Sequence, residues 1–187
     1  MDEKEWIKRI VAGDTQMFSC LVAKYERMAY TIAFRILGNK EEAEEATQDA
    51  FVRMYRALPR FQFESKFSTW FYRIVYRVAI SAVRQRRLFE EVPVETAEAV
   101  TPDERDSALE LLQDSQRQTI IRELLANMRP DESLMLTLFY LEECSIEEIH
   151  QITSLSNVNI KTKLHRARKH LYEQLKARMG KETNELL

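Results

Sequence analysis

Residues 145–169 read SIEEIHQITSLSNVNIKTKLHRARK and have the pattern of two helices joined by a polar turn. Ser145, followed three residues later by Glu148, forms a capping box, in which each side chain bonds the other residue's backbone at a helix start. Three isoleucines at helical spacing give the first helix one apolar face. The second helix begins near Ser156 or Asn157. The segment therefore predicts a helix-turn-helix.

The second of these helices has an apolar face and a polar face. Its predicted buried stripe consists of Ile160, Leu164, Ala167 and Leu171. The residues that project from the opposite side are Thr162, His165, Arg166 and Lys169. A helix with this layout, supported by a shorter helix before it, fits the major groove of duplex DNA.

The polar face carries side chains suited to DNA binding. The cations that can neutralise phosphates are Lys161, Lys163, Arg168 and Lys169. The side chains that can hydrogen-bond base edges are Asn159, Arg166 and His165. The alternative is a basic helix that only faces solvent. The capped helix and the polar turn before it favour DNA binding over that alternative.

The composition predicts an all-α fold. Three glycines and four prolines are too few for a chain of many tight turns, and good helix formers fill the long stretches between them. No apolar run approaches the roughly 20 residues needed to cross a bilayer, and the amino terminus lacks the pattern of a signal peptide. We expect a cytosolic protein without membrane insertion. Cys20 and Cys144 are expected to be reduced, buried thiols.

The net charge of −2 conceals an uneven distribution. Residues 1–88 carry 16 Lys and Arg against 11 Asp and Glu, whereas residues 89–118 carry 2 against 9. Residues 119–187 carry 10 of each sign. The middle segment also loses helical periodicity and contains two of the four prolines, so it predicts a flexible acidic linker that runs into the first helix of a second domain. Helices are predicted over residues 6–12, 15–37, 40–58, 67–87, 102–128 and 130–142, and within 145–179.

Three segments resemble the sigma-70 family of bacterial transcription initiation factors. Glu148-Ile149-His150 and NIKTKLHRAR at 159–168 resemble the fourth conserved region of sigma factors. AEEATQDAF at 43–51 and FSTWFYRI at 67–74 resemble the second region. These motifs stand in the family's order, and the middle DNA-binding domain of larger sigma factors is absent. The chain is therefore similar to the extracytoplasmic-function class.

The resemblance implies two small helical domains. Residues 1–88 form the region-two domain, which binds core RNA polymerase and recognises and melts the minus-10 element. Residues 119–187 form the region-four domain, which recognises the minus-35 element through a helix-turn-helix at about 145–169. The residues implied in polymerase binding are Glu45, Gln48, Asp49, Phe51, Val52, Arg53, Arg56 and Leu58. By itself, the acidic part of this face favours a role in solubility, and only the resemblance favours polymerase binding.

The helix from residue 67 interleaves aromatic side chains with cations, as single-stranded DNA binding requires. The residues implied in minus-10 binding are Phe61, Phe63, Lys66, Trp70, Tyr72, Arg73, Tyr76, Arg77, Arg84 and Arg87. Those implied in minus-35 binding are Asn157, Asn159, Lys161, Thr162, Lys163, His165, Arg166, Arg168 and Lys169. The alternative for Trp70 and the tyrosines is packing in a small core. Arg77, Ser81 and Asn159 depart from the usual family residues, so the promoter sequence is not inherited from relatives.

The implied partners are core RNA polymerase, duplex minus-35 DNA, single-stranded minus-10 DNA and an anti-sigma factor, in an envelope or stress response. The alternative function is a dimeric helix-turn-helix regulator that acts without being a polymerase subunit, but it leaves the two upstream motifs unexplained. The sequence has no phosphate-binding glycine loop, metal-ligand spacing or nucleophile motif. We therefore expect no enzyme activity, no cofactor and no metal.

Overall fold

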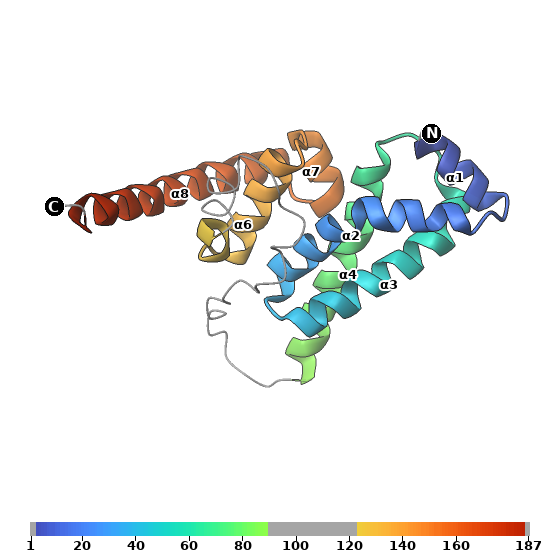
Figure 1. Ribbon diagram of the computed structural model, residues 1–187, viewed down its shortest axis with the longest axis horizontal. Helices are drawn as coiled ribbons and strands as arrows, with labels where there is room; N and C mark the ends of the chain where they lie inside the picture. The colour runs from blue at the N-terminus through green and yellow to red at the C-terminus, as the bar shows by residue number, and fades with distance from the viewer. Residues whose placement is uncertain (1–2, 90–122, 186–187) are drawn as a thin grey trace.

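The structure, a computed structural model, describes residues 3–89 and 123–185 (Figure 1). These residues form helices and the turns between them, without a strand. The prediction of an all-α fold is confirmed. None of the described helices combines the length and the apolar character needed to span a bilayer.

The amino-terminal part contains four α-helices and one short 3₁₀ turn. They are α1 (Glu3–Val11), α2 (Gln16–Leu37), α3 (Lys40–Ala57), η1 (Leu58–Arg60) and α4 (Phe67–Phe89). Gly38 ends α2 in the left-handed conformation at φ 69°, where a residue without Cβ is favoured. Asn39 then caps α3 by accepting a hydrogen bond from the backbone N–H of Glu42. The four helices predicted for this region are confirmed, with ends that differ by at most three residues.

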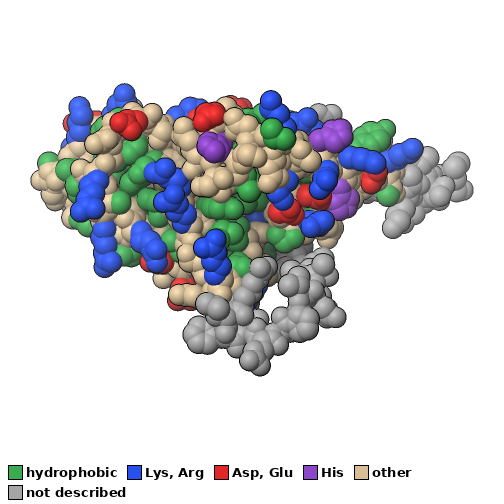
Figure 2. All heavy atoms as spheres, turned by 180° about the vertical axis from the view of Figure 1, so that it is seen from behind, with side chains coloured by type: hydrophobic (Ala, Val, Ile, Leu, Met, Phe, Trp, Pro, Cys, Tyr) green, Lys and Arg blue, Asp and Glu red, His purple; other side chains and the backbone are tan. Residues whose placement is uncertain are grey.

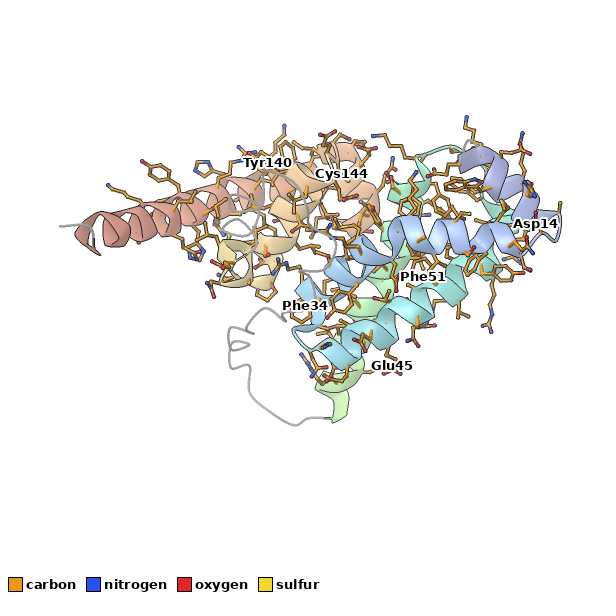
Figure 3. The ribbon with its side chains drawn as sticks, viewed as in Figure 1. Asp14, Phe34, Glu45, Phe51, Tyr140 and Cys144 are labelled. Atoms are coloured by element: carbon orange, nitrogen blue, oxygen red, sulfur yellow. The ribbon has the colours of Figure 1, made fainter. Side chains whose placement is uncertain are left out.

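The core of this part lies among α2, α3 and α4. Ala43, Ala46 and Ala50 are buried on α3, and their small size allows neighbouring helices to approach closely. The rings of Phe51 and Phe71 lie 4.8 Å apart between α3 and α4. Figure 3 shows Phe51 pointing into the space among the three helices.

The carboxy-terminal part contains α6 (Pro130–Leu136), the π-helical turn η3 (Thr137–Leu141), α7 (Ile146–Thr153) and α8 (Asn157–Glu185). The helix predicted over residues 130–142 is thus a short α-helix followed by a π-turn. Most of the helix predicted over residues 102–128 lies outside the described residues, as does the whole predicted linker. The described residues 123–126 are helical.

The two parts pack together rather than standing apart. Helix α7 contacts α4 and helix α6 contacts α2, while α8 lies against α6 and α7. Figure 1 shows α6 and α7 beside the ends of α2 and α4, and the carboxy-terminal end of α8 extending away from the other helices. Buried residues of both parts belong to one continuous core.

Candidate nucleic-acid interface

The first helix of the predicted helix-turn-helix begins at the predicted cap. The backbone N–H of Glu148 donates to the Ser145 hydroxyl at 3.1 Å, and the Glu148 carboxylate accepts from the backbone N–H of Ser145 at 2.8 Å. The capping box is therefore confirmed. Ser154 ends α7 in the left-handed conformation at φ 61°. The next helix, α8, begins at Asn157, as predicted.

The buried and exposed faces of α8 are those predicted from its periodicity. Ile160, Leu164 and Ala167 are buried, and Leu171 is partly buried against the core. The predicted minus-35 residues that are exposed are Asn157, Asn159, Lys161, Thr162, His165, Arg166, Arg168 and Lys169. These side chains are consequently available to a nucleic acid, although their contacts stay predictions.

Two cations of α8 have partners within the protein. Lys163 is partly buried, and its Nζ lies 2.5 Å from the Asp131 carboxylate on α6. Partial burial favours a higher pKa for Asp131, but the hydrogen bond and charge of Lys163 outweigh it and hold that pKa below its ordinary value. Arg168 lies over the rings of Phe139 and Tyr140, at 5.6 and 5.8 Å from the ring centres. These contacts orient α8 against α6 and η3.

The carboxy-terminal part thus contains partners that sequence reasoning missed. Asp131 follows Pro130 in the first turn of α6. Acidic residues are common in the first turn of a helix because they interact favourably with the helix dipole, so Asp131 gave no sign of a distant partner. Its pairing with Lys163 spans 32 positions of the chain, and no local pattern indicates it.

The predicted minus-10 surface divides into exposed and buried residues. Lys66, Phe63, Arg77 and Arg84 are exposed, while Trp70, Arg73 and Tyr76 are partly buried. The ring of Trp70 lies 4.9 Å from that of Phe61, so Trp70 belongs in part to the core, as the alternative interpretation had it. The side chain of Arg87 lies outside the described part of the structure.

Two predicted minus-10 residues are core residues in this structure. Tyr72 is only 2% exposed, and its hydroxyl donates to the Glu142 carboxylate at 2.6 Å. Burial first, and then this hydrogen bond, raise the pKa of Tyr72 above its ordinary range. Phe61 is 8% exposed and packs against Phe67 and Trp70. The outward orientation predicted for Tyr72 is therefore wrong for this arrangement, because Tyr25 of α2 and Glu142 lie against that side of α4.

The predicted polymerase-binding face of α3 also divides into exposed and buried residues. Glu45, Gln48, Val52, Arg53 and Arg56 are exposed, and Asp49 is partly buried. Phe51 on α3 and Leu58, the first residue of η1, are buried in the core at 8% and 2% exposure. Their side chains are therefore not exposed on this face in the structure, and their assignment to polymerase binding stays a prediction.

Tyr55 is an exposed residue of α3 that the sequence reasoning missed. It lies seven positions after Gln48 and three after Val52, so helical spacing places all three on one face. Its ring packs edge-on against Phe18 of α2, with ring centres 5.0 Å apart. Helix periodicity alone was sufficient to place Tyr55 on the predicted polymerase-binding face of α3.

The sequence has matches among known families and proteins. Residues 21–89 match the family described as Sigma-70 region 2, and residues 118–171 match Sigma-70, region 4. The ECF RNA polymerase sigma factor SigW of Bacillus subtilis is 30% identical over 186 residues, which cover 92% of this chain and 96% of the relative. The chain belongs to the extracytoplasmic-function sigma factors of the sigma-70 family. A second relative of this sigma factor is the ECF RNA polymerase sigma-E factor of Escherichia coli K12, 28% identical over 170 residues, covering 87% of this chain and 88% of the relative.

Solved structures share the fold of this sigma factor. CnrH in complex with the cytosolic domain of CnrY has a TM-score of 0.60 at 20% identity, covering 94% of this chain and 97% of CnrH. The sigma factor RpoE of Bartonella quintana in complex with the anti-sigma factor NepR has a TM-score of 0.61 at 20% identity, covering 85% and 96%. At this identity the likeness concerns the fold alone.

One face of this sigma factor is rich in cations. Figure 2 shows Lys and Arg side chains spread over this face, with hydrophobic side chains between them and fewer Asp and Glu side chains. Such a mixture suits a nucleic acid, whose phosphates contact the cations while its bases contact apolar groups.

Proposed function

We propose that this sigma factor binds core RNA polymerase and directs it to promoters, where α8 reads the minus-35 element and α4, with the loop before it, binds the melted minus-10 strand. The observation that carries the proposal is the exposed polar face of α8, which stands on a buried stripe behind a capped helix. This arrangement presents Arg166 and its neighbours to a major groove.

The exposed face of α3 supports the polymerase contact. Val52 and Tyr55 are large apolar side chains at 47% and 41% exposure, next to the exposed Gln48. Apolar groups ringed by polar ones are typical of protein interfaces. We assign this face to the polymerase because it lies within the region-two match and away from α8.

The experiment that tests this function is run-off transcription with purified core polymerase on a library of genomic fragments. Specific transcripts that depend on the added sigma factor are the expected result, and their start sites give the promoter sequence. Core polymerase alone is the control. If no transcript depends on the protein while it binds duplex DNA alone as a dimer, the chain acts as a free-standing regulator.

An anti-sigma factor is a further proposed partner. The solved Bartonella quintana relative is a complex with such a protein, NepR. Purification of this sigma factor from cells whose growth conditions vary, followed by identification of bound proteins, tests whether it has a partner of this type.

A further inference from the structure

Val158 is the most exposed large apolar side chain in the part of the chain that the structure describes. It is 75% exposed and is the second residue of α8, at the end of a recognition helix that contacts base edges. It was not among the residues expected to bind the minus-35 element. A single exposed valine is common on protein surfaces and by itself indicates no function. The neighbours of Val158 and its place on α8 decide what it can do.

The polar side chains next to Val158 have partners within the protein. The side-chain amide of Asn157 donates to the Glu147 carboxylate at 3.4 Å. The hydroxyl of Thr162, one turn after Val158, donates to the backbone carbonyl of Val158 at 2.9 Å. Because this bond uses the hydroxyl proton of Thr162, its methyl group is left for apolar contacts.

Val158 and Thr162 belong to the exposed face of α8. Positions 158, 162, 166 and 169 follow one another at spacings of four, four and three residues, so they lie along one side of the helix. The buried stripe that contains Ile160 and Leu164 lies on the other side. The exposed side therefore begins with two apolar groups and continues with two cations.

An apolar group at the start of this face selects one kind of base. In the major groove, only thymine presents a methyl group, and the methyl groups of small side chains such as threonine contact it. Adenine, guanine and cytosine present hydrogen-bonding groups there, which an apolar side chain leaves without a partner. Val158 and the methyl group of Thr162 are consequently suited to a thymine and unsuited to the other bases.

We propose that Val158 and the Thr162 methyl group contact the methyl group of a thymine in the minus-35 element and so specify an A·T pair there. This inference rests on the proposed function, because it takes α8 as the helix that recognises minus-35 DNA. Helix α8 rises about 12 Å between Val158 and Arg166. This rise equals the length of about four base pairs. The thymine therefore lies within about four base pairs of the guanine assigned to Arg166.

The test removes one methyl group at a time from the DNA. Each thymine in the minus-35 element of a promoter found by run-off transcription is replaced by deoxyuridine, which keeps every hydrogen-bonding group of thymine and lacks only its methyl group. Competition between the two promoters for polymerase that carries the full-length sigma factor gives the ratio of their affinities, the methyl ratio. We expect a methyl ratio of about fourfold at one position, the usual effect of burying one methyl-sized group.

Three variants show which residue makes the contact. Val158→Ala removes two methyl groups and should lower the methyl ratio to less than about twofold. Thr162→Ser keeps the hydroxyl that bonds the Val158 carbonyl and should lower the ratio because its methyl group is lost. The matched control is Val11→Ala, the same substitution at a 48% exposed position of α1, and it should keep the ratio of the unmodified protein. Each ratio compares two DNAs on one protein, so a partial loss of active protein does not alter it.

The outcomes separate this inference from the proposed function. A methyl ratio that persists in Val158→Ala overturns the inference, and so does an unmodified protein that binds every deoxyuridine promoter as tightly as the thymine promoter. A minus-35 element of G·C pairs alone also overturns it. In these three cases promoter complexes still form, so the proposed function stands. If polymerase with the unmodified protein forms no promoter complex, the proposed function fails and the inference fails with it.

Discussion

The hydroxyl of Tyr72 on α4 donates a hydrogen bond of 2.6 Å to the carboxylate of Glu142, 70 positions further along the chain. This bond joins the region-two helix to the segment that precedes the helix-turn-helix. The ring of Tyr72 is buried against Tyr25 and Phe71, and the bond gives its hydroxyl a partner within the protein. The relationship gives a first prediction about stability.

Replacing Tyr72 with phenylalanine keeps the ring but leaves the partly buried Glu142 carboxylate without this donor. We expect the free energy of unfolding to fall by about 1–3 kcal/mol, the usual cost of an unsatisfied buried partner. Chemical denaturation followed by circular dichroism measures the change. Tyr140→Phe, at a 54% exposed position, is the matched control and should shift the value by less than about 0.5 kcal/mol. Equal effects of the two changes would show that the bond adds no stability.

The Asp131–Lys163 pair predicts a pH-dependent contribution to stability. The pKa of Asp131 is lowered in the folded state, so the pair stabilises the protein above the ordinary aspartate pKa and loses its effect as the pH falls through the lowered pKa. Asp131 is 42% exposed, so we expect Asp131→Asn to cost only about 0.5–1 kcal/mol at neutral pH. The difference from the unmodified protein should shrink on acidification towards pH ~3. A difference that is constant with pH would contradict a role for the charge.

Substitutions on the exposed face of α3 should weaken polymerase binding without destabilising the fold. Gln48→Ala with Asp49→Ala should weaken binding to core polymerase in a competition assay, with less than about 0.5 kcal/mol lost in unfolding free energy. Phe51→Leu, two positions after Asp49, should instead destabilise the fold, because Phe51 is buried against Phe71. Unchanged polymerase affinity in the double variant would remove this face from the proposed interface.

Tyr76 predicts a step-specific defect in initiation. It is partly buried on α4, and this burial raises the pKa of its hydroxyl above the ordinary value. Tyr76→Ala should slow open-complex formation, because it removes a ring on which a base can stack for about 1–3 kcal/mol. The defect would be seen as weaker permanganate reactivity of promoter thymines. Closed-complex binding in a gel-shift assay should persist. Loss of both steps together, with a lower melting temperature, would make Tyr76 a packing residue.

Arg166 and Lys169 predict two kinds of DNA contact on α8. Both are exposed on the face opposite the buried stripe. Arg166→Ala should reduce the transcription ratio between intact and scrambled minus-35 elements, because an arginine paired with guanine gives about 1–3 kcal/mol of discrimination. Lys169→Ala should lower transcription from both promoters by the same factor and make DNA binding less dependent on salt concentration, as the loss of a phosphate contact does. If the ratio is unchanged in the Arg166 variant, the base contacts would instead be assigned to Asn159, Thr162 or His165.

Local features of the chain were sufficient to predict the four amino-terminal α-helices and the helix-turn-helix. The capping box at Ser145, the left-handed turn at Gly38 and the stripe that contains Ile160 and Leu164 depend on residues within a few positions of one another. Helix periodicity and caps arise from such short-range geometry, so they can be read from a sequence. The same periodicity correctly separated the exposed polar face of α8 from its buried face.

The contacts between distant segments were decided only in three dimensions. Nothing near Tyr72 or Lys163 indicates a carboxylate partner, and the burial of Phe51 required the packing of α3 on α4 rather than a surface role. The π-turn at 137–141 likewise has an apolar pattern that an ordinary helix would share. Side chains of one helix stripe face either solvent or another helix, and only the docking of α7 on α4 decides between them. A periodic pattern gives the side of a helix that a residue occupies, whereas its partner across 70 positions depends on how the whole chain packs.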